Sequence, residues 1–157
     1  MSISQKNCMM QVSKLILVNC ITKERTAENL SFNRILVPHI KTNYQLQEEN
    51  GLKKVFDDNE YYLFSNVLQE NGMWQDAEYL QSQIGKMRTK KSAKNASTLA
   101  SMNDLALTYS QQGKYNEAKV LQLKVMDLHK MMLGPEHPYT LISMNNLVVT
   151  YSREGKY

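Results

Sequence analysis

Apolar residues recur every three or four positions along most of this 157-residue chain, and this spacing predicts helices rather than strands. Within residues 98–115 one such stripe is formed by Met102, Leu105, Ala106 and Tyr109. After Gly113 a second stripe is formed by Ala118, Leu121, Val125 and Leu128. The spacing therefore predicts a helix over about 97–112, a tight turn, and a second helix over about 115–133.

The same pattern returns later in the chain. Residues 98–115 read TLASMNDLALTYSQQGKY and residues 140–157 read TLISMNNLVVTYSREGKY, an offset of 42 with 12 of 18 positions identical. A fixed period in this range is typical of proteins built from stacked repeats. Between the copies, Gly134 is expected to end one helix and Pro138 to begin the next.

A third and more divergent copy precedes these two. Trp74 aligns with Tyr115 at an offset of 41, and Tyr115 with Tyr157 at 42. Asp57-Asp58-Asn59-Glu60 is expected to start its first helix and Glu70-Asn71-Gly72 to end it, with the second helix over Trp74 to about Lys90. Its predicted core positions are Tyr61, Phe64, Ser65, Leu68, Ala77, Leu80, Ile84 and Met87. The expected repeats are 57–96, 97–138 and 139–157, the last incomplete.

The incomplete last repeat has a predicted consequence. Its helix should present Met144, Leu147, Val148 and Tyr151 to a second helix that residues 139–157 do not contain. We therefore expect exposed apolar surface at this end, which frays or self-associates.

The region before the repeats is less regular. Residues 28–56 are expected to form a helical lead-in, either a helix pair or one helix kinked at Pro38, with a stop at Asn50-Gly51. Residues 1–27 are an uncertain N-terminal segment, and we keep open that they are the remnant of a preceding domain. Their apolar run from Val12 to Val18 fits a strand or a short helix.

The residues from Met102 to Ala118 follow the pattern Leu-x-x-Leu-Ala-x-x-Tyr-x-x-x-Gly-x-Tyr-x-x-Ala, with methionine in the first position. This pattern resembles the tetratricopeptide repeat. The 42-residue period and the loop Leu-Gly-Pro-Glu-His-Pro-x-Thr-Leu, which begins at Leu133, resemble its longer kinesin-light-chain variety. That variety is also found in C-terminal arrays of fungal and bacterial signalling ATPases of the NACHT and NB-ARC kind.

The resemblance covers residues 57–157, and residues 29–47 are similar to the helical lead-in of those ATPase arrays. The first copy departs from the pattern, because Asn66 replaces an apolar residue and 90–95 lack the Gly-Pro-x-His-Pro loop. The resemblance implies an all-α fold: a tetratricopeptide-repeat superhelix of stacked antiparallel helix pairs, an α-solenoid.

Composition narrows the class of function. The chain is 42% hydrophobic and 22% charged, with a net charge of +4, which is typical of a folded domain. Lys53-Lys54 and Lys90-Lys91 are pairs without interleaved aromatic residues, so no nucleic-acid partner is expected. The apolar run before Cys20 is too short to span a membrane, so no membrane association is expected. Cys8 and Cys20 are too few for a disulfide framework, which favours a cytoplasmic protein.

No catalytic or metal-binding motif stands out. Glycine–lysine pairs occur without the spacing of a phosphate-binding loop, and no HExxH, CxxC or GxSxG motif is present. The histidines His39, His129 and His137 fall on different elements, and His137 is interpreted as a helix-start or loop residue. We therefore expect no enzyme activity, cofactor or metal.

The opposite face of each first helix carries the candidate binding residues. They share a helical face at spacings of four, seven and eight: Asn103, Leu107, Ser110, Gln111, Asn145, Val149, Ser152 and Arg153. The resemblance implies that this face lines a peptide-binding groove. Amide side chains can pair with the backbone of an extended peptide, while Leu107, Val149 and Arg153 would supply selectivity.

Two functions follow from these expectations. The first is a non-enzymatic scaffold that binds a peptide or a partner protein in the groove of its repeats. The alternative, implied by the resemblance, is a ligand-sensing regulatory array that belongs to a larger NB-ARC or NACHT-type signalling ATPase. The two differ in what lies upstream of the repeats.

Overall fold

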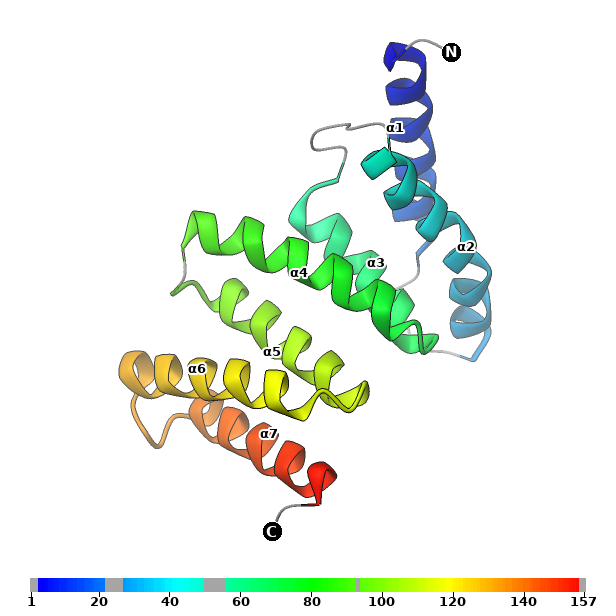
Figure 1. Cartoon of the computed structure of the whole chain (residues 1–157). Coiled ribbons are helices and arrows are strands. Elements are labelled where there is room, and N and C mark those ends of the chain that lie inside the picture. Colours follow the sequence, from blue (N-terminus) through cyan, green and yellow to red (C-terminus); the bar gives the residue numbers. More distant parts are fainter. Residues whose placement is uncertain (1–2, 22–26, 50–55, 93, 156–157) are drawn as a thin grey trace. The chain divides into compact units, whose positions relative to one another are not determined.

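In the computed structural model, residues 3–21, 27–49, 56–92 and 94–155 are described, and within these ranges they form seven helices and no strand (Figure 1). The helices are α1 (Ile3–Cys20), α2 (Ala27–Glu49), α3 (Asp58–Glu70), α4 (Trp74–Lys91), α5 (Ala96–Gln111), α6 (Tyr115–Leu133) and α7 (Pro138–Glu154). The all-α prediction is confirmed. The chain divides into two compact units, Met1–Ala77 (unit 1) and Glu78–Tyr157 (unit 2), which are described separately.

In unit 1, α1 and α2 decide two open alternatives. The apolar run near Val18 belongs to a helix and not to a strand. Helix α2 continues through Pro38 as one helix, so the helix-pair alternative is wrong. The exposed proline lies on the outer side of α2, and the Thr42 hydroxyl donates to its carbonyl oxygen at 2.9 Å. The predicted stop at Asn50-Gly51 lies outside the described residues, as does the Lys53-Lys54 pair.

Polar contacts tie the elements of unit 1 to each other. The Lys14 ammonium of α1 lies 2.9 Å from the Glu60 carboxylate of α3. The Asn43 amide of α2 donates to the Ser13 hydroxyl of α1 at 2.9 Å. Beneath these contacts, the core contains Met10, Leu17, Ile40, Tyr44, Phe56 and Phe64.

Helix α3 begins as the sequence predicts. The Asp57 carboxylate accepts hydrogen bonds from the backbone N–H groups of Asn59 and Glu60, at 2.8 and 2.9 Å. The Glu60 carboxylate in turn accepts from the Asp57 N–H at 2.8 Å, which completes a capping box. The predicted core positions of α3 are all buried: Tyr61, Phe64, Ser65 and Leu68.

In unit 2, the predicted helices are confirmed to within a residue or two. Helix α6 spans Tyr115–Leu133 as predicted. Gly113, with a φ of 76°, occupies the left-handed region in the turn between α5 and α6, a conformation that glycine adopts without strain. His137 caps α7, because its Nδ1 accepts from the Tyr139 N–H at 3.2 Å, and Pro138 takes the first helical position.

Equivalent positions of successive copies make equivalent polar contacts within unit 2. Glu78 of α4 accepts hydrogen bonds from Gln112, at 2.9 Å, and from Lys114, at 2.7 Å. One copy later, Lys119 of α6 takes the place of Glu78, and Glu154 takes the place of Gln112. These two side chains pair at 2.9 Å, so the sign of the charge on the second helix is reversed between copies.

The repeat boundaries 57–96, 97–138 and 139–157 remain predictions. The division between the two units falls after Ala77, inside the first predicted repeat. The aligned residues Trp74 and Tyr115 are both half-buried, while their third counterpart, Tyr157, lies outside the described residues.

Candidate functional site

The predicted groove residues lie on α5 and α7 of unit 2, two helices that are in direct contact. The Asn146 amide of α7 donates to the Asn103 side-chain oxygen of α5 at 2.8 Å. Because this bond uses the side-chain oxygen of Asn103, the side-chain NH2 group can still donate to a ligand. The neighbouring predicted residues that are exposed are Leu107, Gln111, Asn145, Val149, Ser152 and Arg153.

Ser110 differs from the other predicted residues. It is only 3% exposed, although Ser152 at the equivalent position of α7 is exposed. Ser110 lies one helical turn after Ala106, which is fully buried, and therefore shares the packed side of α5. Its hydroxyl does not reach the surface, and we leave Ser110 out of the candidate site.

A pocket opens beside Asn103 at the start of α5 and α7, with a volume of about 460 Å³. We call it the α5–α7 pocket. Helix α5 contributes Ala96, Ser97, Leu99, Ala100 and Asn103; helix α7 contributes Tyr139, Ile142 and Ser143; helix α6 contributes His129. None of these residues carries a permanent charge, so the pocket offers apolar walls with a few hydrogen-bonding groups.

His129 is held in place by α7. Its Nδ1 lies 2.7 Å from the Ser143 hydroxyl, and its ring stacks on Tyr139 with 6.0 Å between centroids. The Ser143 hydroxyl donates to the Tyr139 carbonyl oxygen at 2.9 Å, so its single proton is already used. With the hydroxyl proton on the Tyr139 carbonyl, Nδ1 of His129 carries a proton and donates to Ser143, and Nε2 is unprotonated in the neutral ring; this tautomer is assigned from the hydrogen-bond network. Burial and the nearby His137 lower the pKa of His129.

The sequence did not single out His129. The sequence does contain one indication of a polar contact at His129, because His129 aligns with the basic residue Arg88 at an offset of 41. Arg88 is buried and donates to the Ser97 carbonyl oxygen at 2.9 Å, so this position places a polar group against the next helix in both copies.

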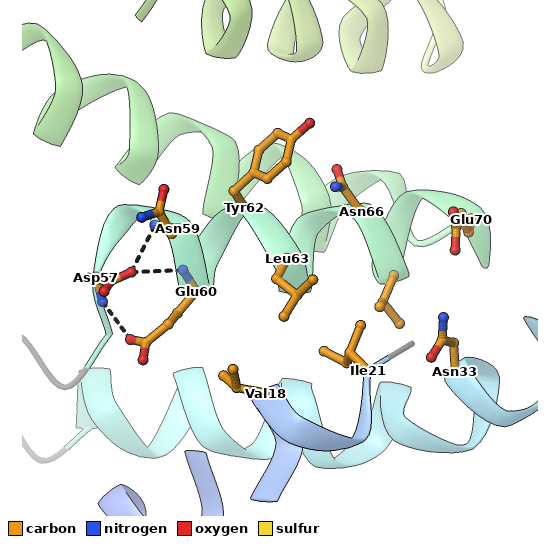
Figure 2. Close-up of a pocket in the computed structure, with 11 residues that line it drawn as sticks. Val18, Ile21, Asn33, Asp57, Asn59, Glu60, Tyr62, Leu63, Asn66 and Glu70 are labelled. Atoms are coloured by element: carbon orange, nitrogen blue, oxygen red, sulfur yellow. Dashed lines mark hydrogen bonds between the residues drawn. The ribbon is translucent and has the colours of Figure 1, made fainter. Parts of the chain in front are cut away.

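A larger hollow of about 760 Å³ lies in unit 1, along α3. Figure 2 shows Ile21 and Leu63 pointing toward one another across it, with Asn33 of α2 at one end. The carboxylates Asp57 and Glu60 at the other end are engaged in the capping box of α3. None of the predicted site residues lines this hollow.

Neither a metal centre nor a membrane span is found in the described part of the chain. Among residues 3–21, 27–49, 56–92 and 94–155, no three His, Cys, Asp or Glu side chains gather in a way that could hold a metal ion. In those same ranges, no helix has the length and apolar character needed to cross a bilayer.

Comparison with known proteins agrees with this architecture. Residues 98–139 match the family described as tetratricopeptide repeat. The structure resembles the crystal structure of nearly identical TPR-like repeats of a proposed kinesin light chain from Podosopora anserina, with a TM-score of 0.60 and 21% identity over 97% of this chain and 80% of that chain. A single-substitution variant of those repeats gives the same values.

BtubC (BKLC) from P. vanneervenii has a TM-score of 0.56 and 14% identity, over 98% of this chain and 70% of that chain. No curated protein sequence matches the chain. The likenesses between structures concern the fold, and the family match concerns residues 98–139. Residues 98–139 therefore form a tetratricopeptide repeat, and the chain shares the solenoid fold of these kinesin-light-chain-type repeat structures.

Proposed function

We propose that unit 2 binds an extended peptide segment of a partner protein across the exposed faces of α5 and α7. Tetratricopeptide repeats generally mediate protein–protein interactions, and folds of this type are typically non-catalytic scaffolds. The proposal adds the place of binding and the kind of partner. Its main support is the pair of amides, Asn103 and Asn145, on two helices whose carboxylates, Asp104 and Glu154, are both half-buried.

The character of this surface supports a peptide partner. The amides of Asn103 and Asn145 can donate to, and accept from, a peptide backbone of any sequence. Leu107 and Val149, which are 42% and 37% exposed, offer apolar contact to alternate side chains. Arg153 is exposed, while Glu154 is paired with Lys119, so the surface favours a peptide that is not strongly basic.

The differences between the copies would set selectivity. Leu107 of α5 corresponds to Val149 of α7, and Gln111 corresponds to Arg153. The identical residues of the two copies are mostly packing positions, so these exchanged residues are where one partner peptide would be distinguished from another.

The test is a double substitution, Asn103→Ala with Asn145→Ala. Peptides of 12 residues are selected on the full chain from a random library, and their affinities are measured by fluorescence anisotropy. Losing two hydrogen bonds of about 1 kcal/mol each should weaken binding about thirtyfold. The control replaces two amides on second helices, Asn116→Ala with Gln83→Ala, and should leave affinity unchanged. Equal affinities of the two double variants for the peptides would refute the proposal that Asn103 and Asn145 bind the peptide.

We also propose that α7 supports association between copies of the chain. Leu141 is 53% exposed, whereas its equivalent Leu99 is 1% exposed. Val148 is 64% exposed, whereas its equivalent Ala106 is fully buried. Sedimentation velocity should show a concentration-dependent dimer that Val148→Lys abolishes. A monomer at all concentrations, with strong hydrogen-exchange protection across residues 140–154, would contradict this proposal.

Two further proposals concern the location of the protein and its membership of a larger protein. A cytoplasmic location is consistent with Cys8 and Cys20, which are both free thiols. Membership of a larger NB-ARC or NACHT-type ATPase would be decided by coding sequence upstream of Met1 that contains a phosphate-binding loop.

A further inference from the structure

We infer that the α5–α7 pocket is a subsite for one uncharged, apolar side chain of the bound peptide, and that His129 makes its occupancy depend on pH. This inference rests on the proposed peptide-binding function of unit 2. It adds the chemical class of the anchoring side chain and a means of releasing it.

The pocket has the size and chemistry of a side-chain site. A volume of about 460 Å³ exceeds what one leucine or phenylalanine side chain needs and leaves room for its backbone. Leu99 and Ala100 form the wall on α5, and Ile142 forms the wall on α7. Because no lining residue carries a permanent charge, a charged side chain would lose its hydration without gaining an ionic partner.

The pocket is continuous with the proposed groove. Asn103, which is half-buried, lines the pocket, and the exposed Leu107 follows it one helical turn further along α5. A peptide whose carbonyl oxygen accepts from the Asn103 amide would therefore place a neighbouring side chain at the mouth of the pocket. This shared residue links backbone recognition with side-chain recognition.

His129 is the group that responds to pH. It lines the pocket, and the bond of Nδ1–H to Ser143 leaves Nε2 to take up the second proton. The titratable groups facing it are His137 of the α6–α7 loop and Tyr139 of α7, while the α5 side chains of the same pocket carry no charge. Protonation at Nε2 would place an uncompensated positive charge in an apolar site.

Linkage gives the direction of the effect. Burial already lowers the pKa of His129, and an apolar occupant removes more water from the imidazolium and lowers that pKa further. Binding then releases a proton, so affinity is full when the ring is neutral and falls as pH decreases through the pKa of the empty pocket. An additional shift of one pKa unit corresponds to a loss of affinity that reaches about tenfold once the pH is below the pKa values of both the empty and the occupied pocket.

The probe is N-acetyl-L-leucinamide, titrated into the full chain and followed by NMR at pH 7.5 and pH 5.0, with N-acetyl-L-aspartate α-amide as its charged counterpart. We expect the leucine probe to shift the signals of Ala100 and Ile142 at pH 7.5, and to bind several-fold more weakly at pH 5.0. The aspartate probe should not shift them. Equal binding of the leucine probe at both pH values, or shifts confined to other residues, would overturn the inference.

Three variants isolate the pocket. His129→Gln keeps a side-chain donor and should remove the pH dependence. His137→Asn keeps a helix-capping acceptor and should preserve it. Ala100→Leu fills the pocket and should abolish binding of the leucine probe, whereas Val120→Leu, at an exposed position of α6, should not. A pH dependence that survives His129→Gln would contradict the role of His129.

The outcome is separable from that of the proposed function. If library peptides bind through Asn103 and Asn145 but are insensitive to Ala100→Leu and to pH, the subsite is wrong and the groove stands. If the leucine probe binds with the expected pH dependence but no peptide depends on the two asparagines, the subsite stands and the groove is wrong.

Discussion

Asp104 of α5 is a carboxylate whose surroundings oppose its charge. Burial raises its pKa from 3.8 to about 6, even though the positive charge of Arg88 acts in the opposite direction. The equivalent residue of the next copy is Asn146, a neutral side chain of nearly the same shape. Replacing Asp104 by asparagine therefore introduces the residue that α7 already has at this position, and it should stabilise the fold at neutral pH.

The size of the effect follows from the shift in pKa. A difference of about two units corresponds to about 3 kcal/mol between the charged and the neutral side chain. Because the folded-state pKa is raised, the fold favours protonated Asp104: this contribution is fully present below about pH 4 and is lost as pH rises through about 6. Asp104→Asn, which cannot ionise, should therefore match the wild type near pH 4 and exceed it by about 2–3 kcal/mol at pH 7.5.

The assay is urea denaturation followed by circular dichroism at half-unit steps from pH 4.0 to 7.5, for the wild type, Asp104→Asn and Asp127→Asn. The last variant removes an exposed carboxylate of α6 and serves as the control. The free-energy difference between Asp104→Asn and the wild type should grow with pH, while that of the control should stay nearly constant. A difference that is independent of pH, or a variant less stable than the wild type at pH 7.5, would refute the reasoning.

Three further changes test the local structure by the same denaturation assay. Gly113→Ala should lower the free energy of unfolding by about 1 kcal/mol, because the φ of Gly113 is 76°. Gly85→Ala, inside α4 with nothing within 4 Å of the added Cβ, should raise it by about 0.5–1 kcal/mol. Changes of the same sign in both variants would contradict this reasoning. Asp57→Ala removes the cap of α3 and should cost about 1 kcal/mol, which Asp57→Ser should largely restore. Lys119 and Glu154 pair at 2.9 Å, with side chains only 14% and 12% exposed. A double-mutant cycle on the two residues should give a coupling free energy of about 1 kcal/mol. A coupling near zero would show that the ion pair does not contribute to stability.

The sequence predicted the helices of unit 2 closely because each stripe of apolar residues is bounded by a residue with special backbone chemistry. Gly113 and Pro138 mark helix boundaries whatever lies around them. The run near Val18 could not be assigned, since a few consecutive apolar residues fit a strand and a helix equally well. The sequence could also not show that α2 continues through Pro38. Pro38 lies on the outer side of the helix, where the lack of a backbone N–H donor is tolerated.

The candidate site was harder to predict than the fold, for a physical reason. Spacing tells which residues share a helical face, but it does not tell how far the packed side extends around the helix. Ser110 shares a face with Leu107 by spacing and is nevertheless buried. The α5–α7 pocket is lined by residues of three helices, and one of them, His129, comes from α6. The apolar residues of α6 predict only a packed core face, so the sequence pattern gives no sign of a pocket residue on this helix.

The reversed charge between Glu78 and Lys119 has a consequence for the number of repeats that the chain can lose or gain. Deleting residues 98–139 would remove one 42-residue unit and would join the first predicted repeat directly to α7 at Thr140. The shortened product would keep every helical stripe, yet Glu78 would then face Glu154 without Lys119 between the copies. The carboxylate of Glu154 would replace the amide donor of Gln112 beside Glu78, so electrostatics would oppose the loss of a repeat although the apolar pattern would permit it.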